Sequence, residues 1–256
     1  MLAFNDLMSP FCGSTNNSDR LENHEVKIIK ASDFFSRTVS PMTTTASVIG
    51  IKFQNGVAIA ADVGGNYGSL NRYKYLERIY KVNNSIVMAT TGDYADFQYI
   101  KDFVQQRIIS EEILEDNFSM KPFSLHTWLT RVMYNRRSKM DPLWNNVVVA
   151  GFDAQGPFLG AVDKLGLSYQ DTCVATGMGS YLVTPMLRDA VDKYRGNMTK
   201  QQAQQVLAQG MEILFYRDTQ SAQKFQTAFV TAEGVEITPE IEIKGAWDIA
   251  TYVSGY

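Results

Sequence analysis

The stretch Thr43–Asp62, TTTASVIGIKFQNGVAIAAD, carries the pattern that decides the fold. It predicts a strand over 47–53, a turn at 54–56 and a second strand over 57–61. The Asn-Gly pair in the turn supplies the positive backbone angles that a tight hairpin requires. The second strand ends in a carboxylate, Asp62, after five uncharged residues. Apolar side chains fall on both faces, as expected of a sheet covered on both sides: Val48, Ile49, Ile51, Phe53, Val57 and Ile59.

The order of the remaining elements predicts an α+β fold. Further hairpins are expected over 79–91, 147–162 and 225–237, and Gly92-Asp93 is expected to open a helix. Ser124 is the expected N-cap of a second helix, which begins after Pro122 and ends at Arg136-Arg137-Ser138-Lys139. Two more helices are expected over about 181–194 and from Thr199 onward. Two antiparallel sheets between two helix layers fit this order better than a doubly wound parallel sheet.

The glycine-rich segment 63–70, VGGNYGSL, raises the possibility of phosphate binding. It lacks the Lys-Ser/Thr pair of a P-loop and the spacing of a dinucleotide fingerprint. A turn-rich crossing with close backbone approach is therefore the favoured interpretation. The only histidines, His24 and His126, are too few and too far apart to suggest a metal cluster. We expect neither a cofactor nor a metal.

The composition excludes some classes of protein but does not indicate a function. The 256 residues are enough for one large domain, with 45% hydrophobic and 20% charged residues and a net charge of −3. Nothing in these values suggests a nucleic-acid or membrane partner, and no apolar run approaches the length of a membrane span. The start of the chain lacks the pattern of a secretory signal. Cys12 and Cys173 could pair, but two cysteines exclude a disulfide framework and favour the cytoplasm or nucleus.

The opening stretch resembles the start of a proteasome beta subunit, a family of N-terminal-nucleophile hydrolases. The resemblance implies their alpha-beta-beta-alpha sandwich of two antiparallel sheets between helix layers. In an active member a cut after a glycine exposes a threonine, whose hydroxyl attacks the peptide carbonyl. Its own amine, a lysine and an aspartate assist. Alignment without gaps on 56–62 places Ala46, a methyl group, where that threonine would be.

The resemblance also assigns the other positions of the site. Asp62 matches the aspartate, and Arg78 occupies the place of the lysine. An arginine keeps its proton near neutral pH and therefore cannot relay one. Met178, in Gly177-Met178-Gly179, replaces the serine of a Gly-Ser-Gly turn, and a thioether cannot take over that role. Because such groups act as a unit, the site is expected to be inactive.

Two supporting positions match in type. Residues 216–221, YRDTQS, resemble the Tyr-Arg-Asp-x-x-Ser of the family, whose aspartate and serine lie behind the threonine. These positions are Asp218 and Ser221. A structural interpretation is favoured for both, as capping and turn-forming residues at the end of a helix.

Longer motifs resemble the eukaryotic beta-7 type, a non-catalytic branch of this family. They lie at 64–70, 92–99 and 136–145, within a likeness that runs from about 41 to 255. The resemblance implies a structural subunit of the 20S core particle, with other alpha and beta subunits as partners and regulatory particles as indirect ones. Two alternatives stay open. One is an active threonine peptidase that uses Thr43, Thr44 or Thr45 after unusual processing, and the other is a free-standing binding module.

The expected organisation has three parts: an N-terminal arm or propeptide over 1–41, partly removable, a proteasome beta-type domain over 42–244, and a C-terminal tail over 245–256. The tail carries four apolar residues that no later element can cover: Trp247, Ile249, Tyr252 and Val253. Burying them offsets about as much free energy as fixing the backbone costs, so the tail should not order against its own domain. The resemblance implies that it docks on subunits of the opposite beta ring. The basic cluster 136–139 either grips a partner or is a solvated helix end.

Overall fold

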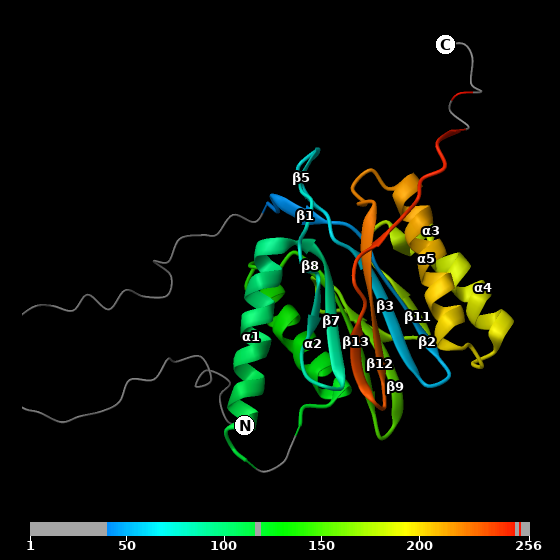
Figure 1. Ribbon diagram of the computed structural model, residues 1–256. Helices are drawn as coiled ribbons and strands as arrows, with labels where there is room; N and C mark the ends of the chain where they lie inside the picture. Colours follow the sequence, from blue (N-terminus) through cyan, green and yellow to red (C-terminus); the bar gives the residue numbers. More distant parts are fainter. Residues whose placement is uncertain (1–39, 116–118, 249–250, 252–256) are drawn as a thin grey trace, which may run out of the picture. The chain divides into compact units, whose positions relative to one another are not determined.

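Two antiparallel sheets lie face to face between two layers of helices in the computed structural model (Figure 1). The structure describes residues 40–115, 119–248 and 251. The hairpin that opens the sequence argument forms β2 (Val48–Phe53) and β3 (Gly56–Asp62), paired from Val48–Ala61 to Phe53–Gly56. These strands occupy the middle of the smaller sheet. Its order is β11-β2-β3-β12-β13, with β14 also on β12, and the added strands are β11 (Cys173–Ala175), β12 (Lys224–Thr231), β13 (Gly234–Ile237) and β14 (Ile241–Glu242).

The larger sheet has the order β10-β9-β8-β7-β1-β4-β5, with β6 also paired to β7. Its central strand β7 lies between β8 on one side and β1 and β6 on the other. All of its pairings among the described residues are antiparallel. The strands are β1 (Thr43–Thr45), β4 (Gly65–Tyr67), β5 (Leu70–Tyr73), β6 (Ile79–Lys81), β7 (Ile86–Asp93), β8 (Asn145–Asp153), β9 (Gly156–Val162) and β10 (Ser168–Gln170).

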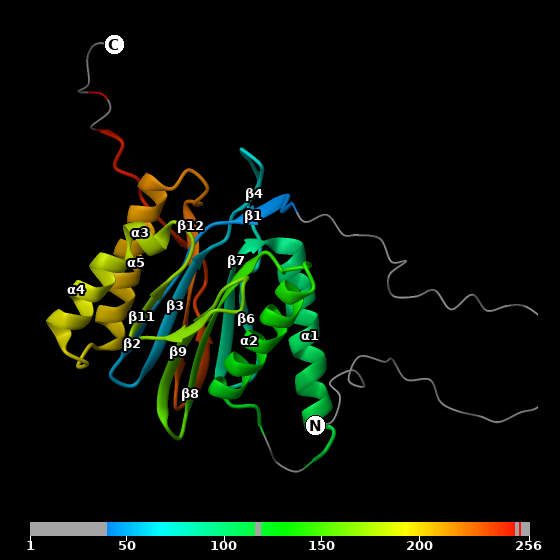
Figure 2. The ribbon, with the colours of Figure 1, turned by 180° about the vertical axis from the view of Figure 1, so that it is seen from behind.

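The helices cover the two outer faces. Helices α1 (Tyr94–Glu112) and α2 (Pro122–Ser138) pack on the larger sheet. The smaller sheet is covered by α3 (Gly179–Leu182), α4 (Thr184–Tyr194) and α5 (Lys200–Arg217), as the reverse view also shows (Figure 2). The result is the expected four-layer alpha-beta-beta-alpha sandwich.

The alternation along β2 and β3 explains why both strands are apolar on two faces. Ile49 and Ile51 point into the cluster beneath α4 and α5, whereas Val48 and Ile59 point into the cluster between the two sheets. Alternate residues of a strand face opposite sides, so one hairpin supplies two separate interfaces. A third cluster joins α1 and α2 to the outer face of the larger sheet.

The predicted elements are present, except that the helix expected over about 181–194 is divided at Val183 into α3 and α4. Two local explanations were wrong. Neither Asn55 nor Gly56 has a positive φ, so the hairpin does not depend on that property. Gly56 is instead required by packing, since a Cβ there would lie 2.2 Å from the carbonyl oxygen of Val230. The cap of α2 was also misplaced: Lys121 is the N-cap and Ser124 lies inside the first turn, because Pro122 fixes the helical start.

The other helix starts follow from their cap residues. Asp93 caps α1 by accepting a hydrogen bond from the amide of Asp96 at 3.1 Å. Thr199 caps α5 in a capping box, in which its side chain and that of Gln202 each accept a hydrogen bond from the backbone amide of the other residue. Such caps satisfy amides that a helix start otherwise leaves without a partner.

Two segments that the sequence left without regular structure complete the larger sheet. Thr43–Thr45 form β1, which pairs with β7 on one side and β4 on the other. The glycine-rich segment 63–70 forms β4 and the turn into β5. The turn-rich interpretation is therefore correct only for residues 68–69, because residues 65–67 are paired as a strand.

The sequence argument expected the tail not to order against its own domain. This was wrong for the described part of the tail, which contacts that domain. The amide of Ala246 donates to the Tyr216 hydroxyl at 2.7 Å, and the Trp247 ring packs edge-on to Phe215 and Tyr216 of α5. Two aromatic neighbours at the end of α5 supply the contact that the sequence argument did not foresee. Ile249, Tyr252 and Val253 lie outside the described residues. Within the described residues, no helix combines the length and apolar character that a membrane span requires.

Candidate functional site

A buried arginine ties together the positions that the resemblance singled out. The Arg78 guanidinium forms an ion pair with a carboxylate oxygen of Asp62, at the end of β3. It also donates to the carbonyl oxygen of Ala46 and, over 3.3 Å and 2.9 Å, to those of Ser47 and Thr90. One cation therefore links the start of β2, the end of β3 and the middle of β7, across both sheets.

Both charges are withdrawn from water, since Arg78 and Asp62 are each 1% exposed. Burial has the largest influence on the pKa of Asp62 and raises it, while the Arg78 charge and the backbone amides of Ala222 and Gly64 oppose that rise. Burial likewise lowers the pKa of Arg78, and Asp62 opposes this change. A guanidinium starts from so high a pKa that it still keeps its proton near neutral pH. Arg78 therefore acts as a fixed donor.

The second carboxylate oxygen of Asp62 also has a partner. It accepts a hydrogen bond from the amide of Ala222 at 3.1 Å, in the loop between α5 and β12. Gly64 closes the pocket around this oxygen, because a Cβ at that position would lie 2.6 Å from the Cβ of Ala222. Both oxygens of Asp62 are therefore engaged, one by Arg78 and the other by the amide of Ala222.

Ala46 lies in the link between β1 and β2 and is 6% exposed. Its side chain is a methyl group, and its carbonyl oxygen is the one held by Arg78. The three threonines before it belong to β1: Thr44 pairs with Asn66 and Asp93, and the Thr45 hydroxyl donates to the carbonyl oxygen of Gly92 at 3.0 Å. The backbone that a cut would have to free is part of the sheet.

The Gly177-Met178-Gly179 turn meets the same end of β2, but not through Met178. Met178 is half exposed and precedes α3, whereas the amide of Gly179 donates to the Ser47 hydroxyl at 2.9 Å. Ser47 is buried, and the sequence argument did not single it out. The available signal was its position, directly after the aligned nucleophile site.

A pair of threonine hydroxyls lies beside this contact and was also missed. The side-chain oxygens of Thr91 and Thr176 hydrogen-bond to each other, and Thr176 also accepts from the Val48 amide at 3.1 Å. Both residues are buried. They come from segments far apart in the chain, so no local pattern could have joined them.

Asp218 and Ser221 occupy the end of α5, as the structural interpretation expected. Asp218 is the C-cap, and its carboxylate accepts a hydrogen bond from the Gln220 amide at 3.0 Å. The amide of Ser221 donates to the Asp218 carbonyl oxygen at 3.1 Å. The charge of Asp218 adds to that of Asp62 in opposing the lowering of the Arg78 pKa by burial. These residues shape the loop that delivers the Ala222 amide to Asp62.

The basic cluster at the end of α2 is largely engaged within the domain. Arg136 pairs with Asp141 at 2.9 Å and lies over the Tyr99 ring, and Arg137 lies over Tyr134.

Over the described ranges, no group of histidine, cysteine and carboxylate side chains has the arrangement of a metal site. The Arg78 site therefore holds a buried ion pair and fixes three backbone segments.

Comparisons with known proteins give the family. The family model described as "Proteasome subunit" matches residues 42–230. A relative in Xenopus laevis named proteasome subunit beta type-4 is 46% identical over 219 residues, covering 86% of this chain and 90% of the relative. The relative of the same name in Drosophila melanogaster is 40% identical, covering 84% of this chain and 80% of its own length.

A relative in Saccharomyces cerevisiae, named proteasome subunit beta type-7, is 36% identical over 228 residues and covers 86% of each chain. The matched span includes the central hairpin, the Arg78 site and all five described helices. The sandwich found above is the fold that this match implies. The chain therefore belongs to the proteasome subunit family and assembles with other subunits of that family.

Proposed function

We propose that this chain is a non-catalytic structural beta subunit of the 20S proteasome core particle, which acts in ubiquitin-dependent protein degradation. The observation that carries the proposal is the bonding of Arg78, whose guanidinium is committed to Asp62 and to the carbonyl oxygens of Ala46, Ser47 and Thr90. A lysine ammonium in this place could tune a neighbouring nucleophile, whereas this guanidinium holds the backbone and keeps its proton.

The alternative of a peptidase that uses Thr43, Thr44 or Thr45 has less support. Any of these residues would have to become the chain terminus, and all three lie in β1 between two neighbouring strands. The Thr45 hydroxyl is also engaged, since it donates a hydrogen bond to the carbonyl oxygen of Gly92. Cleavage within β1 would also remove ladder hydrogen bonds from the larger sheet.

An activity-based probe for threonine proteases tests this assignment in purified native particles. We expect the probe to label other subunits of the same particle and to leave this chain unlabelled. The labelled subunits serve as the internal control for probe access. Covalent labelling of Thr43, Thr44 or Thr45, located by peptide mass mapping, would overturn the proposal.

The same proposal includes the placement of the subunit. It would contact neighbours in its own beta ring and, through the tail 245–256, subunits of the opposite ring, with regulatory particles as indirect partners. Trp247 stays 56% exposed although its ring contacts Phe215 and Tyr216, which supports a tail with apolar surface available to another subunit. The arm 1–41 would be a propeptide that is partly removed. The particle would reside in the cytoplasm and nucleus.

Deletion of residues 245–256 tests the role of the tail. Half-particles should accumulate on a native gel, because each half still forms but the two are no longer clamped together. Trp247→Ala provides a matched point variant that removes the described anchor and leaves the chain length unchanged. Normal amounts of full particle with the deletion would mean that the tail has no such function.

A further inference from the structure

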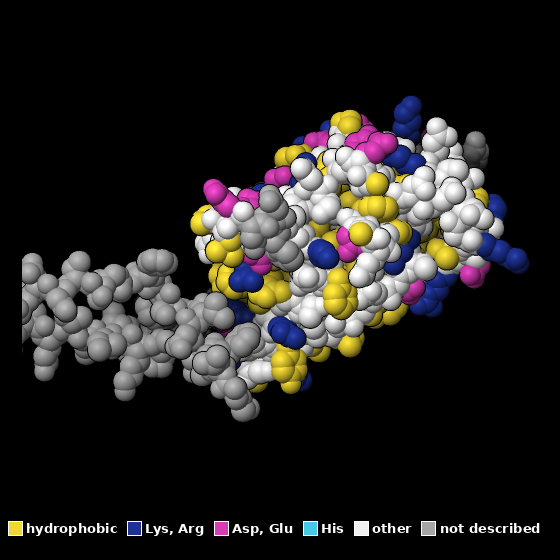
Figure 3. Space-filling model, turned by 90° about the horizontal axis from the view of Figure 1, so that it is seen from below, with side chains coloured by type: hydrophobic (Ala, Val, Ile, Leu, Met, Phe, Trp, Pro, Cys, Tyr) yellow, Lys and Arg dark blue, Asp and Glu magenta, His cyan; other side chains and the backbone are white. Residues whose placement is uncertain are grey.

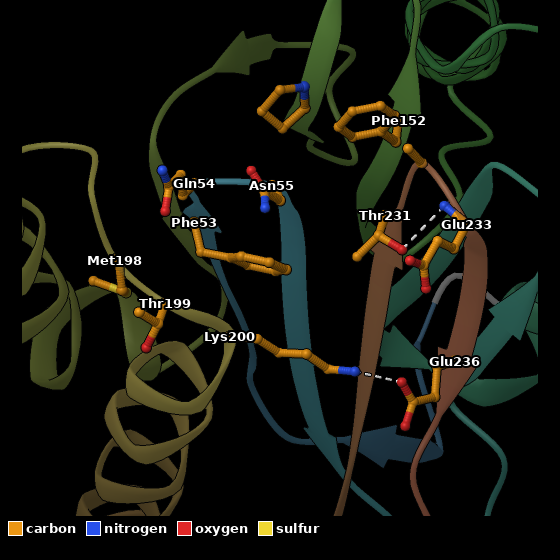
Figure 4. A pocket seen from close by; sticks show the side chains of 12 residues that line it. Phe53, Gln54, Asn55, Phe152, Met198, Thr199, Lys200, Thr231, Glu233 and Glu236 are labelled. Atoms are coloured by element: carbon orange, nitrogen blue, oxygen red, sulfur yellow. Dashed lines mark hydrogen bonds and ion pairs between the residues drawn. The ribbon is translucent and has the colours of Figure 1, made fainter.

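The end of the sandwich away from Arg78 contains a cavity built by turns. Strand β2 runs from Ser47 to the 54–55 turn, so this turn and the buried arginine lie at opposite ends of the same strand. The cavity has a volume of about 590 Å³ and is named here the turn-end cavity. It is lined by the β2–β3, β8–β9 and β12–β13 connections and by the start of α5 (Figure 4).

The inner wall of the turn-end cavity is apolar. It includes Phe53, Phe152, Pro157 and Met198, of which Phe53 and Met198 are buried. Phe53 is held in place by an edge-on contact with Phe229, with the ring centroids 6.3 Å apart. The surface view of this end shows apolar side chains with separate acidic and basic ones among them (Figure 3). Such a wall favours methylene or aromatic groups.

The rim of the turn-end cavity carries more negative than positive side chains. Lys200 crosses from α5 to pair with Glu236 of β13 at 2.5 Å, and its ammonium also lies 4.7 Å from the centre of the Phe229 ring. The backbone amide of Glu233 donates to the Thr231 hydroxyl at 3.3 Å, while its exposed carboxylate has no ion pair among the residues described. One lysine and two glutamates leave the lining with a net charge of −1.

The positive end of α5 does not reverse this balance. The capping box of Thr199 and Gln202 satisfies part of its first turn, and the Lys200 charge is matched by Glu236. An anionic occupant would meet the carboxylate of Glu233, which forms no ion pair with a cation in the described ranges. A cationic occupant would find Glu233 available and the apolar wall behind it.

We propose that the turn-end cavity binds a lysine or arginine side chain from an extended segment of a partner polypeptide. The cation would pair with Glu233, and the long methylene stem or a neighbouring apolar residue would lie against Phe53, Phe152 and Met198. The volume exceeds that of one side chain, so a dipeptide unit fits. β13 is the terminal strand of its sheet and carries Glu236, so an extended segment can run alongside it. This assignment is independent of whether the Arg78 site is catalytic.

The test uses the full-length chain with ¹³C-methyl methionine, so that Met198 reports on the cavity by NMR. Two probes are titrated: acetyl-Phe-Arg-amide and acetyl-Phe-Glu-amide. The arginine probe should shift the Met198 signal with a Kd about fivefold lower than the glutamate probe, the scale of an exposed ion pair. Met198→Leu assigns the signal. Repeating the titration in the assembled particle covers the case of an unstable isolated chain.

Two variants with the same change in charge make the test specific. Glu233→Gln should raise the Kd of the arginine probe about fivefold and abolish the preference over the glutamate probe. Glu212→Gln, an exposed position on α5 outside the cavity, should leave both Kd values unchanged. Equal affinity for the two probes, no shift at Met198, or an unchanged Kd in Glu233→Gln would each overturn the proposal.

Discussion

Charged side chains are buried at one end of the sandwich and exposed at the other. At one end Arg78 and Asp62 are buried, and each has partners from more than one segment of the chain. At the other end Lys200 and Glu236 pair in the open, and Glu233 beside them has no ion pair in the described part of the chain. Both ends are reached by the same strands, β2 and β3.

This difference separates a structural role from a binding role. A buried charge that is bonded to several backbone segments holds them in register, and removing one partner leaves the other uncompensated. An exposed carboxylate adds little to folding and stays available to a partner. The position that resembles a catalytic centre is thus inaccessible to a partner. The end of the sandwich formed by the turns is the accessible one.

The largest effect is expected at Arg78. Arg78→Met would leave the Asp62 charge buried without its counter-ion, at a cost of about 3–5 kcal/mol in the free energy of unfolding. Urea unfolding of the full-length chain measures this change. Lys224→Met, in an exposed pair with Glu240, is the control and should cost at most about 1 kcal/mol. If the two variants lose similar amounts of unfolding free energy, the proposed difference between the two ends is wrong.

A smaller loss is expected at Ser47. Ser47→Ala removes the acceptor of the Gly179 amide in a buried place, and an unsatisfied buried donor costs about 1–3 kcal/mol. Ser180→Ala, whose hydroxyl bonds to Gly177 at the surface, is the control in the same urea experiment. If both variants unfold like the parent, the start of β2 is not held by Ser47.

The sequence predicted the hairpins and the layers because both depend on local alternation and on turn residues. The pattern over 48–61 was sufficient for two strands with two apolar faces. It could not predict β1, because three threonines carry no apolar alternation and are fixed by their pairing with β4 and β7. The turn-forming Gly56 was predicted for the wrong reason, since its need arises from Val230, far along the chain.

The site was predicted in part. Alignment to a family identified Asp62 and Arg78 as partners, and the structure brings them into contact. The role of Arg78 as a link between Ser47 and Thr90 depends on how three strands converge, which spacing alone does not encode. The turn-end cavity was out of reach for the same reason, because its lining comes from several separate connections.

At the exposed end, the effect on folding should be the smallest of the three. Lys200→Met removes a surface ion pair with Glu236, worth at most about 1 kcal/mol. The comparison with Glu236→Gln and the double variant isolates the pair from the packing of the lysine stem on Phe229. A coupling energy above about 2 kcal/mol would show that this end, too, is held by charge.

The sharpest measurement at the Arg78 end is probe labelling of particles that carry Ala46→Thr. This substitution restores a hydroxyl to the aligned nucleophile position but leaves Arg78, Met178 and strand β1 in place. No glycine precedes position 46, so the cut that would expose the new residue lacks its usual site. We predict no labelling of this chain and unchanged chymotrypsin-, trypsin- and caspase-like rates. A covalently labelled chain in the Ala46→Thr particle would contradict the structural role of this site.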